Sequence, residues 1–166
     1  MMILGIDPGT TAVGYAALRM ARGERPCLEQ AGLLAIRSRE PAERLSELHH
    51  ALGAVLREHR PDAVAVEKLF FAKNAKTAMA VAEARGAILL TAALQRATVY
   101  EYTPAEIKKI VTGYGSADKN AVKKMVLLTV PDAGGLRARD DVFDAIAIAL
   151  ACGFRESQGW LPVPRA

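Results

Sequence analysis

Three short apolar runs open the chain and predict strands. Met2 to Asp7 is the first run, and it ends where Pro-Gly-Thr marks a turn. Val13 to Met20 follows as β-type sequence, and Leu28 to Ile36 predicts a third strand. Because only short connections separate the three runs, we expect an antiparallel meander at the start of the fold.

The remainder of the chain alternates helical and strand patterns. Apolar residues recur at helical spacing from Pro41 to Arg60, and the Ala-, Val- and Leu-rich segment from Thr77 to Arg96 predicts a long, mostly buried helix. Short strands are expected at Ala63 to Glu67 and Val99 to Tyr102. Another helix is predicted in TPAEIKKIV, where Thr103 is the N-cap and Glu106 completes a capping box. Two more helices are predicted over Lys119 to Val130 and over Asp141 to Phe154. This order predicts an α/β fold with a mixed five-stranded sheet flanked by helices.

The length of 166 residues fits one domain, which we expect over residues 1–156, with residues 157–166 as a C-terminal tail. No apolar run approaches the roughly 20 residues of a membrane span, and the first residues do not look like a secretion signal. We therefore expect a soluble, cytoplasmic protein with no membrane partner. Cys27 and Cys152 stand far apart in the sequence, which argues against a disulfide framework or a zinc site.

Positive charge is concentrated in the middle of the chain. The segment from Lys68 to Lys124 holds all eight lysines and carries ten basic and four acidic residues, a net charge of +6. The remainder has twelve basic and fourteen acidic residues, a net charge of −2. A cationic segment suits a polyanion such as nucleic acid, although a solvated surface would show the same pattern.

Four carboxylates stand at positions that favour a site. Asp7 and Glu67 each end a short apolar strand, and Asp141 and Asp144 share one face at the start of an apolar helix. Taken singly, Asp7 could form a turn, Glu67 an ion pair, and the two helix acids an ordinary acidic first turn. Taken together, the four could meet at one end of the sheet, where they would need cations to be stable.

The donor set favours hard metal ions. Oxygen ligands without Cys or His neighbours select Mg²⁺ or Mn²⁺ over zinc. The three histidines lie on the predicted Pro41 to Arg60 helix and are expected to have packing or surface roles. Two such ions roughly 4 Å apart are a known arrangement for in-line displacement at phosphorus. An acid cluster beside a basic segment therefore favours phosphodiester cleavage.

Four sequence blocks resemble the RuvC-type Holliday junction endonucleases, whose fold is ribonuclease H-like. They are GIDPGTTAVGYA from Gly5, AVEKLFFAKNAKTAMAVAEARG from Ala65, EYTPAEIKKIVTGYGSADKNAV from Glu101 and DVFDAIAIAL from Asp141. The blocks stand in the family's order and cover most of the chain. The resemblance implies a ribonuclease H-like nuclease domain over residues 1–156, with helices on both faces of the mixed sheet.

The resemblance also implies roles for individual residues. Asp7, Glu67, Asp141 and Asp144 would be the metal-binding catalytic acids, with Asp140 as an open alternative to Asp141. Lys108 and Lys119 match family lysines near the scissile phosphate, although a solvated helix face explains them too. Further DNA contacts are expected from a phenylalanine that inserts into the junction, Phe70 or with shifted register Phe71, and from Lys73, Lys76 and Lys123.

The function implied by the resemblance is a metal-dependent endonuclease that resolves four-way junctions by symmetric nicks in two opposed strands, during homologous recombination and DNA repair. Two Mg²⁺ ions per active site are expected, with Mn²⁺ able to substitute. The implied partners are four-way junction DNA, a second copy of the chain and the RuvAB branch-migration complex. The helix from Thr77 to Arg96 is a candidate dimer interface, although core packing explains it equally well.

Two other functions are compatible with parts of the sequence. GIDPGTT also resembles the first phosphate loop of the actin and sugar-kinase superfamily, but 166 residues hold neither the second half nor the second phosphate motif of such proteins. A related nuclease acting on RNA, or a junction-binding protein without catalysis, is a third possibility, because charge does not distinguish DNA from RNA.

Overall fold

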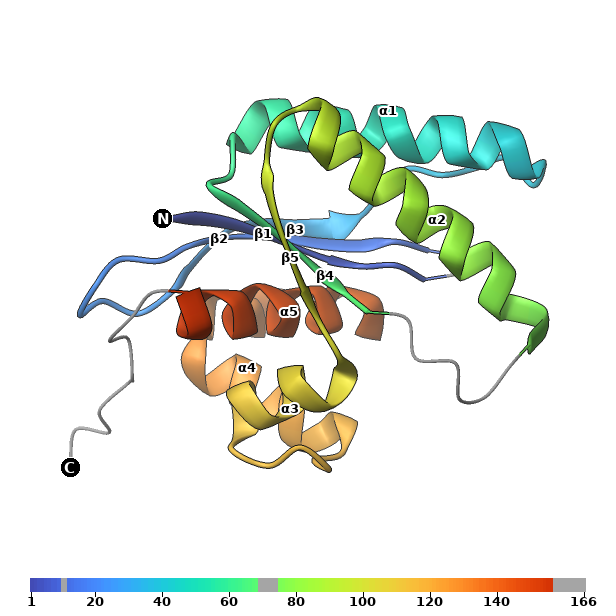
Figure 1. The fold of residues 1–166 in the computed structure, drawn as a ribbon. Coiled ribbons are helices and arrows are strands. Elements are labelled where there is room, and N and C mark those ends of the chain that lie inside the picture. Colours follow the sequence, from blue (N-terminus) through green and yellow to red (C-terminus); the bar gives the residue numbers. More distant parts are fainter. Residues whose placement is uncertain (10–11, 69–74, 157–166) are drawn as a thin grey trace.

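A computed structural model describes residues 1–9, 12–68 and 75–156, with the backbone alone described for residues 75–77. Five strands form one sheet in the order β3-β2-β1-β4-β5 (Figure 1). Their bounds are β1 (Met2–Asp7), β2 (Gly14–Arg19), β3 (Cys27–Leu33), β4 (Ala63–Glu67) and β5 (Thr98–Tyr102). β1, β2 and β3 pair antiparallel, whereas β4 pairs parallel with β1 and β5 parallel with β4. The predicted mixed five-stranded sheet with an antiparallel start is confirmed.

Helices cover both faces of this sheet (Figure 1). On one face lie α1 (Pro41–His59) and α2 (Ala75–Leu94). On the other lies α5 (Asp140–Glu156), with α3 (Pro104–Thr112) and α4 (Lys119–Thr129) packed on its outer side, and a short 3₁₀ helix, η1 (Pro131–Gly135), joins α4 to the segment before α5. The structure therefore confirms the helices on both faces of the mixed sheet that the family resemblance implies.

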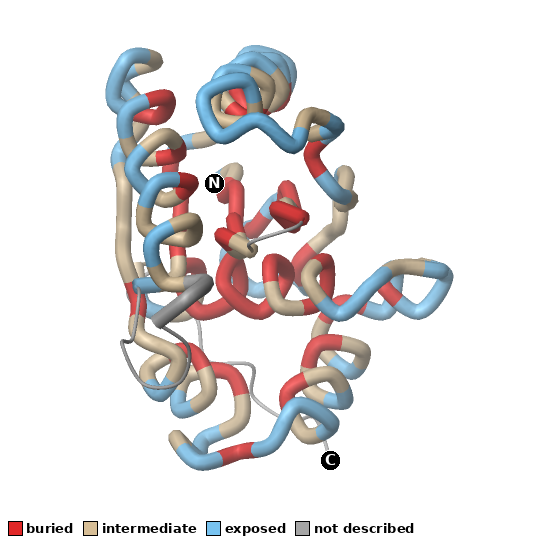
Figure 2. The backbone as a smooth tube through the Cα atoms, turned by 90° about the vertical axis from the view of Figure 1, so that its right-hand side faces the viewer, coloured by how far each residue is buried: buried red, intermediate tan, exposed pale blue. Residues whose placement is uncertain are grey.

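Alternation along the strands divides the core into two clusters. In β1, Ile3 belongs to the cluster under α5, whereas Leu4 and Ile6 belong to the cluster under α1 and α2. In β4, Ala65 faces α5, whereas Val64 faces the other helices. Side chains alternate between the faces of a strand, so the residue that ends each strand continues on the α5 side. Figure 2 shows the buried residues gathered in the strands and in α5.

The predicted capping box at the start of α3 is present. The Thr103 hydroxyl accepts a hydrogen bond from the backbone N–H of Glu106 at 3.2 Å, and the Glu106 carboxylate accepts one from the backbone N–H of Thr103 at 2.9 Å. These bonds satisfy backbone donors that have no partner within the helix. The capping box therefore begins α3 directly after β5.

The prediction of a mostly buried helix from Thr77 to Arg96 is wrong for one face of α2. Ala84, Ile88 and Ala92 are buried, but Met79 and Leu90 are 69% and 59% exposed. The helix is apolar on all sides, so the sequence pattern alone cannot tell which side stays uncovered. The sheet and α1 cover only the inner side. No helix of the described ranges is long and apolar enough to cross a membrane.

Glycines allow α5 to lie directly against the sheet. A Cβ atom on Gly5 of β1 would lie 2.2 Å from the carbonyl oxygen of Ala145, and one on Gly14 of β2 would lie 2.1 Å from that of Asp141. Both distances are far inside van der Waals contact, so only glycine fits at these crossings. Their spacing sets how far along the sheet the first turn of α5 lies.

We expect Gly5→Ala to lower the free energy of unfolding by about 1–3 kcal/mol or more, because the added methyl group would force α5 away from β1. Gly134→Ala is the matched control, since its Cβ would meet nothing within 4 Å. Urea denaturation of the two variants and the wild type measures the effect. Equal stability of Gly5→Ala and Gly134→Ala would show that α5 does not depend on this close contact.

Candidate active site

Two carboxylates lie side by side at one end of the sheet. Asp7 ends β1 and Glu67 ends β4, and these strands are parallel neighbours with Ile6 opposite Val66. The next residue of each strand therefore continues at the same edge. By alternation both carboxylates continue on the α5 side of the sheet. The predicted meeting of the two strand-end acids is thus a consequence of strand register.

Burial makes these two carboxylates difficult to ionise. Burial, together with repulsion from Glu67, Asp144 and Asp141, raises the pKa of Asp7 to about 7. Burial likewise raises the pKa of Glu67 to about 7, with repulsion from Asp144 as the second cause. Near neutral pH each group is therefore ready to lose its proton when positive charge arrives.

The first turn of α5 brings two more carboxylates to the same place. The carbonyl oxygen of Asp141 lies where Gly14 would carry a Cβ atom, and Gly14 pairs with Asp7 across β1 and β2. The side chains of Asp141 and Asp144 are 29% and 36% exposed, whereas that of Asp140 is 69% exposed. Asp140 therefore lies on the solvent side of the turn, whereas Asp141 and Asp144 are partly buried near the strand ends.

Basic side chains from neighbouring elements surround the acids. Lys119 Nζ lies 3.1 Å from Asp144 Oδ2 and 4.0 Å from Asp140 Oδ2. Partial burial lowers the pKa of Lys119, but the hydrogen bond and negative charge of Asp144 outweigh this and raise it overall. Lys108 of α3 lies close enough that its charge offsets part of the rise in the pKa of Glu67. Two predicted lysines therefore border the acids.

Lys123 and Arg139 complete this basic border. Lys123 Nζ lies 4.0 Å from Asp140 Oδ1 and 4.3 Å from the centre of the Phe143 ring, so a cation–π contact holds it in place. Arg139 Nε lies 3.4 Å from Asp141 Oδ2. Arg139 is the residue that the sequence analysis missed. The available signal was an arginine two positions before Asp141, at the start of an acidic helix.

The structure brings six of the predicted site residues into one electrostatic neighbourhood. They are Asp7, Glu67, Asp141, Asp144, Lys108 and Lys119. Phe70, Phe71 and Lys73 lie outside the described residues, and for Lys76 only the backbone at the start of α2 is described. The histidines lie on α1; His49 Nδ1, for example, lies 2.9 Å from Thr91 Oγ1, which accounts for it without a metal.

The donor chemistry of the site fits a divalent cation. Four carboxylates whose mutual repulsion opposes ionisation would be stabilised by added positive charge, and oxygen ligands suit Mg²⁺ or Mn²⁺. Their present arrangement is not a finished ligand set: among the described residues, no group of three Asp, Glu, His or Cys side chains is placed to hold a metal ion. Asp141 and Asp144 instead contact Arg139 and Lys119.

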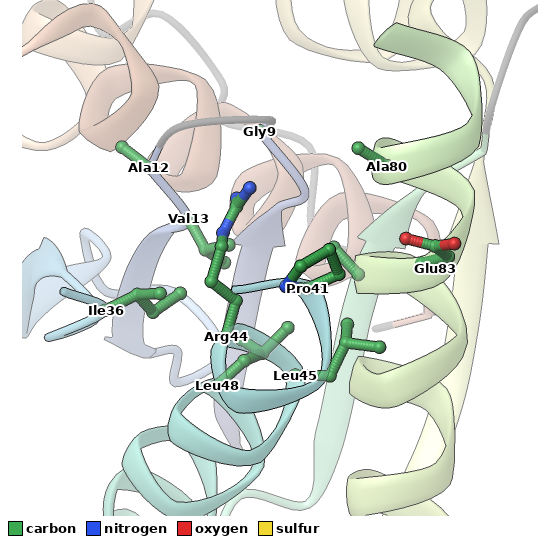
Figure 3. Close-up of a pocket in the computed structure, with 11 residues that line it drawn as sticks. Gly9, Ala12, Val13, Ile36, Pro41, Arg44, Leu45, Leu48, Ala80 and Glu83 are labelled. Carbon is green, nitrogen blue, oxygen red and sulfur yellow. The ribbon is translucent and has the colours of Figure 1, made fainter. Parts of the chain in front are cut away.

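A separate apolar hollow lies on the opposite face of the sheet. Figure 3 shows it between α1, α2 and the turn after β1, with Val13 and Leu48 among the lining residues and with Arg44 and Glu83 as its charged groups. α5 and its aspartates are on the other side of the sheet. The hollow is therefore not part of the acidic site.

The chain is similar to one family throughout. Residues 3–152 match the family model described as "Crossover junction endodeoxyribonuclease RuvC". The protein of that name from Halothermothrix orenii is 39% identical over 164 residues, which cover 96% of this chain and 98% of the relative.

Two solved structures of Thermus thermophilus RuvC are also similar. The first is 32% identical with a TM-score of 0.83, covering 96% of this chain and 97% of the other. The second, titled as a complex with Holliday junction substrate, is 34% identical with a TM-score of 0.85, covering 96% of both. Fold and sequence therefore agree on the same family.

We expect the metal-free protein to lose stability as the pH rises from about 4 to about 7. The pKa values of Asp7 and Glu67 are about 7 in the folded protein against ordinary values of 3.8 and 4.5, so the folded state binds more protons in this interval. Urea denaturation in chelator at several pH values measures the slope. Asp7→Asn should reduce the slope relative to Asp132→Asn, an exposed control on η1. Equal slopes would contradict the raised pKa of Asp7.

Proposed function

This chain belongs to the RuvC family of crossover junction endodeoxyribonucleases, and we propose that its Asp7, Glu67, Asp141 and Asp144 form the active site. Membership makes it a metal-dependent endonuclease that resolves Holliday junctions in DNA recombination and repair. The observation that carries the assignment is the convergence of two strand-end acids, with pKa values of about 7, on two helix acids with a basic border. One nuclease domain over residues 1–156 contains all four.

The four carboxylates would hold two Mg²⁺ ions, with Mn²⁺ able to take their place. When bound, such ions supply Lewis acidity to the attacking and leaving oxygens of phosphodiester hydrolysis. Asp7 and Glu67 would form the central pair, because they end neighbouring strands and neither makes an ion pair within the described part of the chain. Asp7 and Glu67 would be deprotonated when they hold the ions.

The basic border has a complementary role toward the DNA. Lys108 and Lys119 flank the acids from α3 and α4 and would bind the scissile phosphate as compact cations. Lys123 lies one helical turn after Lys119, so it would contact a neighbouring phosphate. Phosphate contacts of this kind position a nucleic acid without reading its sequence.

Asp7→Asn should lower junction cleavage by more than about 100-fold, because it removes a central ligand rather than an outer partner. Junction binding should stay equal or become tighter, since a negative charge beside the phosphates is lost. Denaturing gels of a synthetic four-way junction and its linear duplex arm, with Mg²⁺, Mn²⁺ or chelator, measure cleavage, and gel shifts measure binding. Asp132→Asn is the charge-matched control. Cleavage by Asp7→Asn at the wild-type rate would refute the assignment.

A homodimer through the outer face of α2 would place two such sites on one junction. Met79, Glu83, Gly86 and Leu90 recur at helical spacing and are all exposed, and Leu94 adds a further 65% exposed side chain beside them. A Cβ on Gly86 would meet nothing within 4 Å, so a second helix could approach closely there. A twofold dimer matches a substrate that is cut symmetrically in two opposed strands.

Leu90→Glu should weaken the dimer by about tenfold or more, since twofold symmetry introduces the charge on both sides of the interface. Leu128→Glu is the matched control, because Leu128 is 61% exposed on α4, away from α2. Sedimentation velocity over a concentration series measures dissociation, and a cruciform plasmid reports whether the two nicks stay paired. A fully dimeric Leu90→Glu protein would place the interface elsewhere.

Four further assignments rest on the family resemblance. Phe70, or Phe71 with a shifted register, would insert between bases at the junction, where aromatic stacking is worth about 1–3 kcal/mol per base. Lys73 and Lys76 would contact the DNA backbone beside it. RuvAB would deliver the junction, and the cytoplasm would be the site of action.

A further inference from the structure

The proposed site is divided into an unpaired and a paired half. Asp7 and Glu67 are partly buried and form no ion pair within the described ranges. Asp141 and Asp144 are each held by a cation from outside α5, with Arg139 Nε 3.4 Å from Asp141 Oδ2 and Lys119 Nζ 3.1 Å from Asp144 Oδ2. The acids needed to complete a metal site therefore already have positively charged partners.

This pairing accounts for two observations that otherwise disagree. The first turn of α5 lies against Gly14, which pairs with Asp7, yet the described residues contain no three side chains arranged as metal ligands. Asp141 and Asp144 contact Arg139 and Lys119, and they do not point with Asp7 at a common centre. The missing ligand geometry is a matter of side-chain direction, because the backbone of α5 is already against the sheet.

Arg139 has no evident role in stabilising the helix that follows it. It immediately precedes α5, and its carbonyl oxygen accepts a hydrogen bond from the N–H of Val142 at 3.0 Å. A cation at this end of a helix opposes the helix dipole, which favours negative charge there. The guanidinium nevertheless lies against Asp141, and 62% of the Arg139 side chain is exposed. Its ion pair with Asp141 is therefore the interaction to explain.

We propose that Arg139 is a positioning residue that holds Asp141 away from the metal-ligand set, so that divalent-ion binding competes with the Arg139–Asp141 ion pair. This inference rests on the proposed function, since it takes Asp141 as a ligand. The guanidinium of Arg139 attracts the same carboxylate charge that would attract a metal ion, and it already lies 3.4 Å from Asp141 Oδ2. Arg139 thereby lowers the affinity of the site for divalent ions, and Asp141 joins the ligand set only when an ion binds.

Removing the guanidinium should tighten metal binding. Arg139→Gln should bind Mn²⁺ about two- to fivefold more tightly, which is the size of effect expected for a partly exposed ion pair. Arg139→Lys restores a cation at the same position and should return the affinity toward that of the wild type. Arg137→Gln removes the same charge two residues earlier, where the described residues show no ion pair, and should leave the affinity within about twofold of wild type.

Free Mn²⁺ measured by electron paramagnetic resonance during titration of each purified protein reports affinity without any DNA or cleavage. Asp7→Asn serves as the reference for the site itself. If Asp7→Asn loses binding and Arg139→Gln binds more tightly than Arg137→Gln, the inference is supported. If Asp7→Asn loses binding but Arg139→Gln matches Arg137→Gln or binds more weakly, Arg139 does not compete with the metal and only this inference fails. If Asp7→Asn binds like wild type, the metal site is elsewhere and the proposed function fails with it.

Discussion

Direct contact between α5 and the two central strands is the constraint on which the rest of the structure depends. Gly5 and Gly14 leave no room for a side chain between β1, β2 and the helix, so backbone meets backbone at both crossings. A helix held at two points can neither slide along the sheet nor rotate against it. The first turn of α5 therefore lies at the carboxyl ends of β1 and β4, next to Asp7 and Glu67.

The clustered carboxylates lower the stability of the folded protein at neutral pH. Burial and mutual repulsion hold the carboxyls of Asp7 and Glu67 near pKa 7, which makes their ionisation costly at neutral pH. Lys119 of α4 offsets part of this repulsion, and Arg139 pairs with Asp141 at the start of α5. The apolar core on both faces of the sheet supplies the stability that such a site requires. The acids that the proposed function needs therefore reduce the stability that the apolar core provides.

Local sequence patterns are sufficient to predict the helices and strands and the two acids at the strand ends. Alternation in β1 and β4 and the capping box at Thr103 are properties of short segments, so the sequence predicts them directly. The uncovered face of α2 was not predictable in this way, because an apolar helix has no polar side to mark where neighbours are missing. The Arg139–Asp141 pair was also missed, because which side chains meet in a first turn depends on packing around it. The assignments of Phe70 and Lys73 remain predictions from resemblance.

The placement of α5 as the last described element has a consequence for how the enzyme is made. During synthesis, Asp7 and Glu67 leave the ribosome more than seventy residues before Asp141 and Asp144. Until α5 follows, one face of the sheet lacks its cover and the proposed site has only its two strand-end acids. A partly synthesised chain therefore cannot assemble the four-carboxylate site, even with its basic segment already exposed to nucleic acid. The capacity to cut DNA arises together with the completed core, so a nuclease of this design is harmless until it is folded.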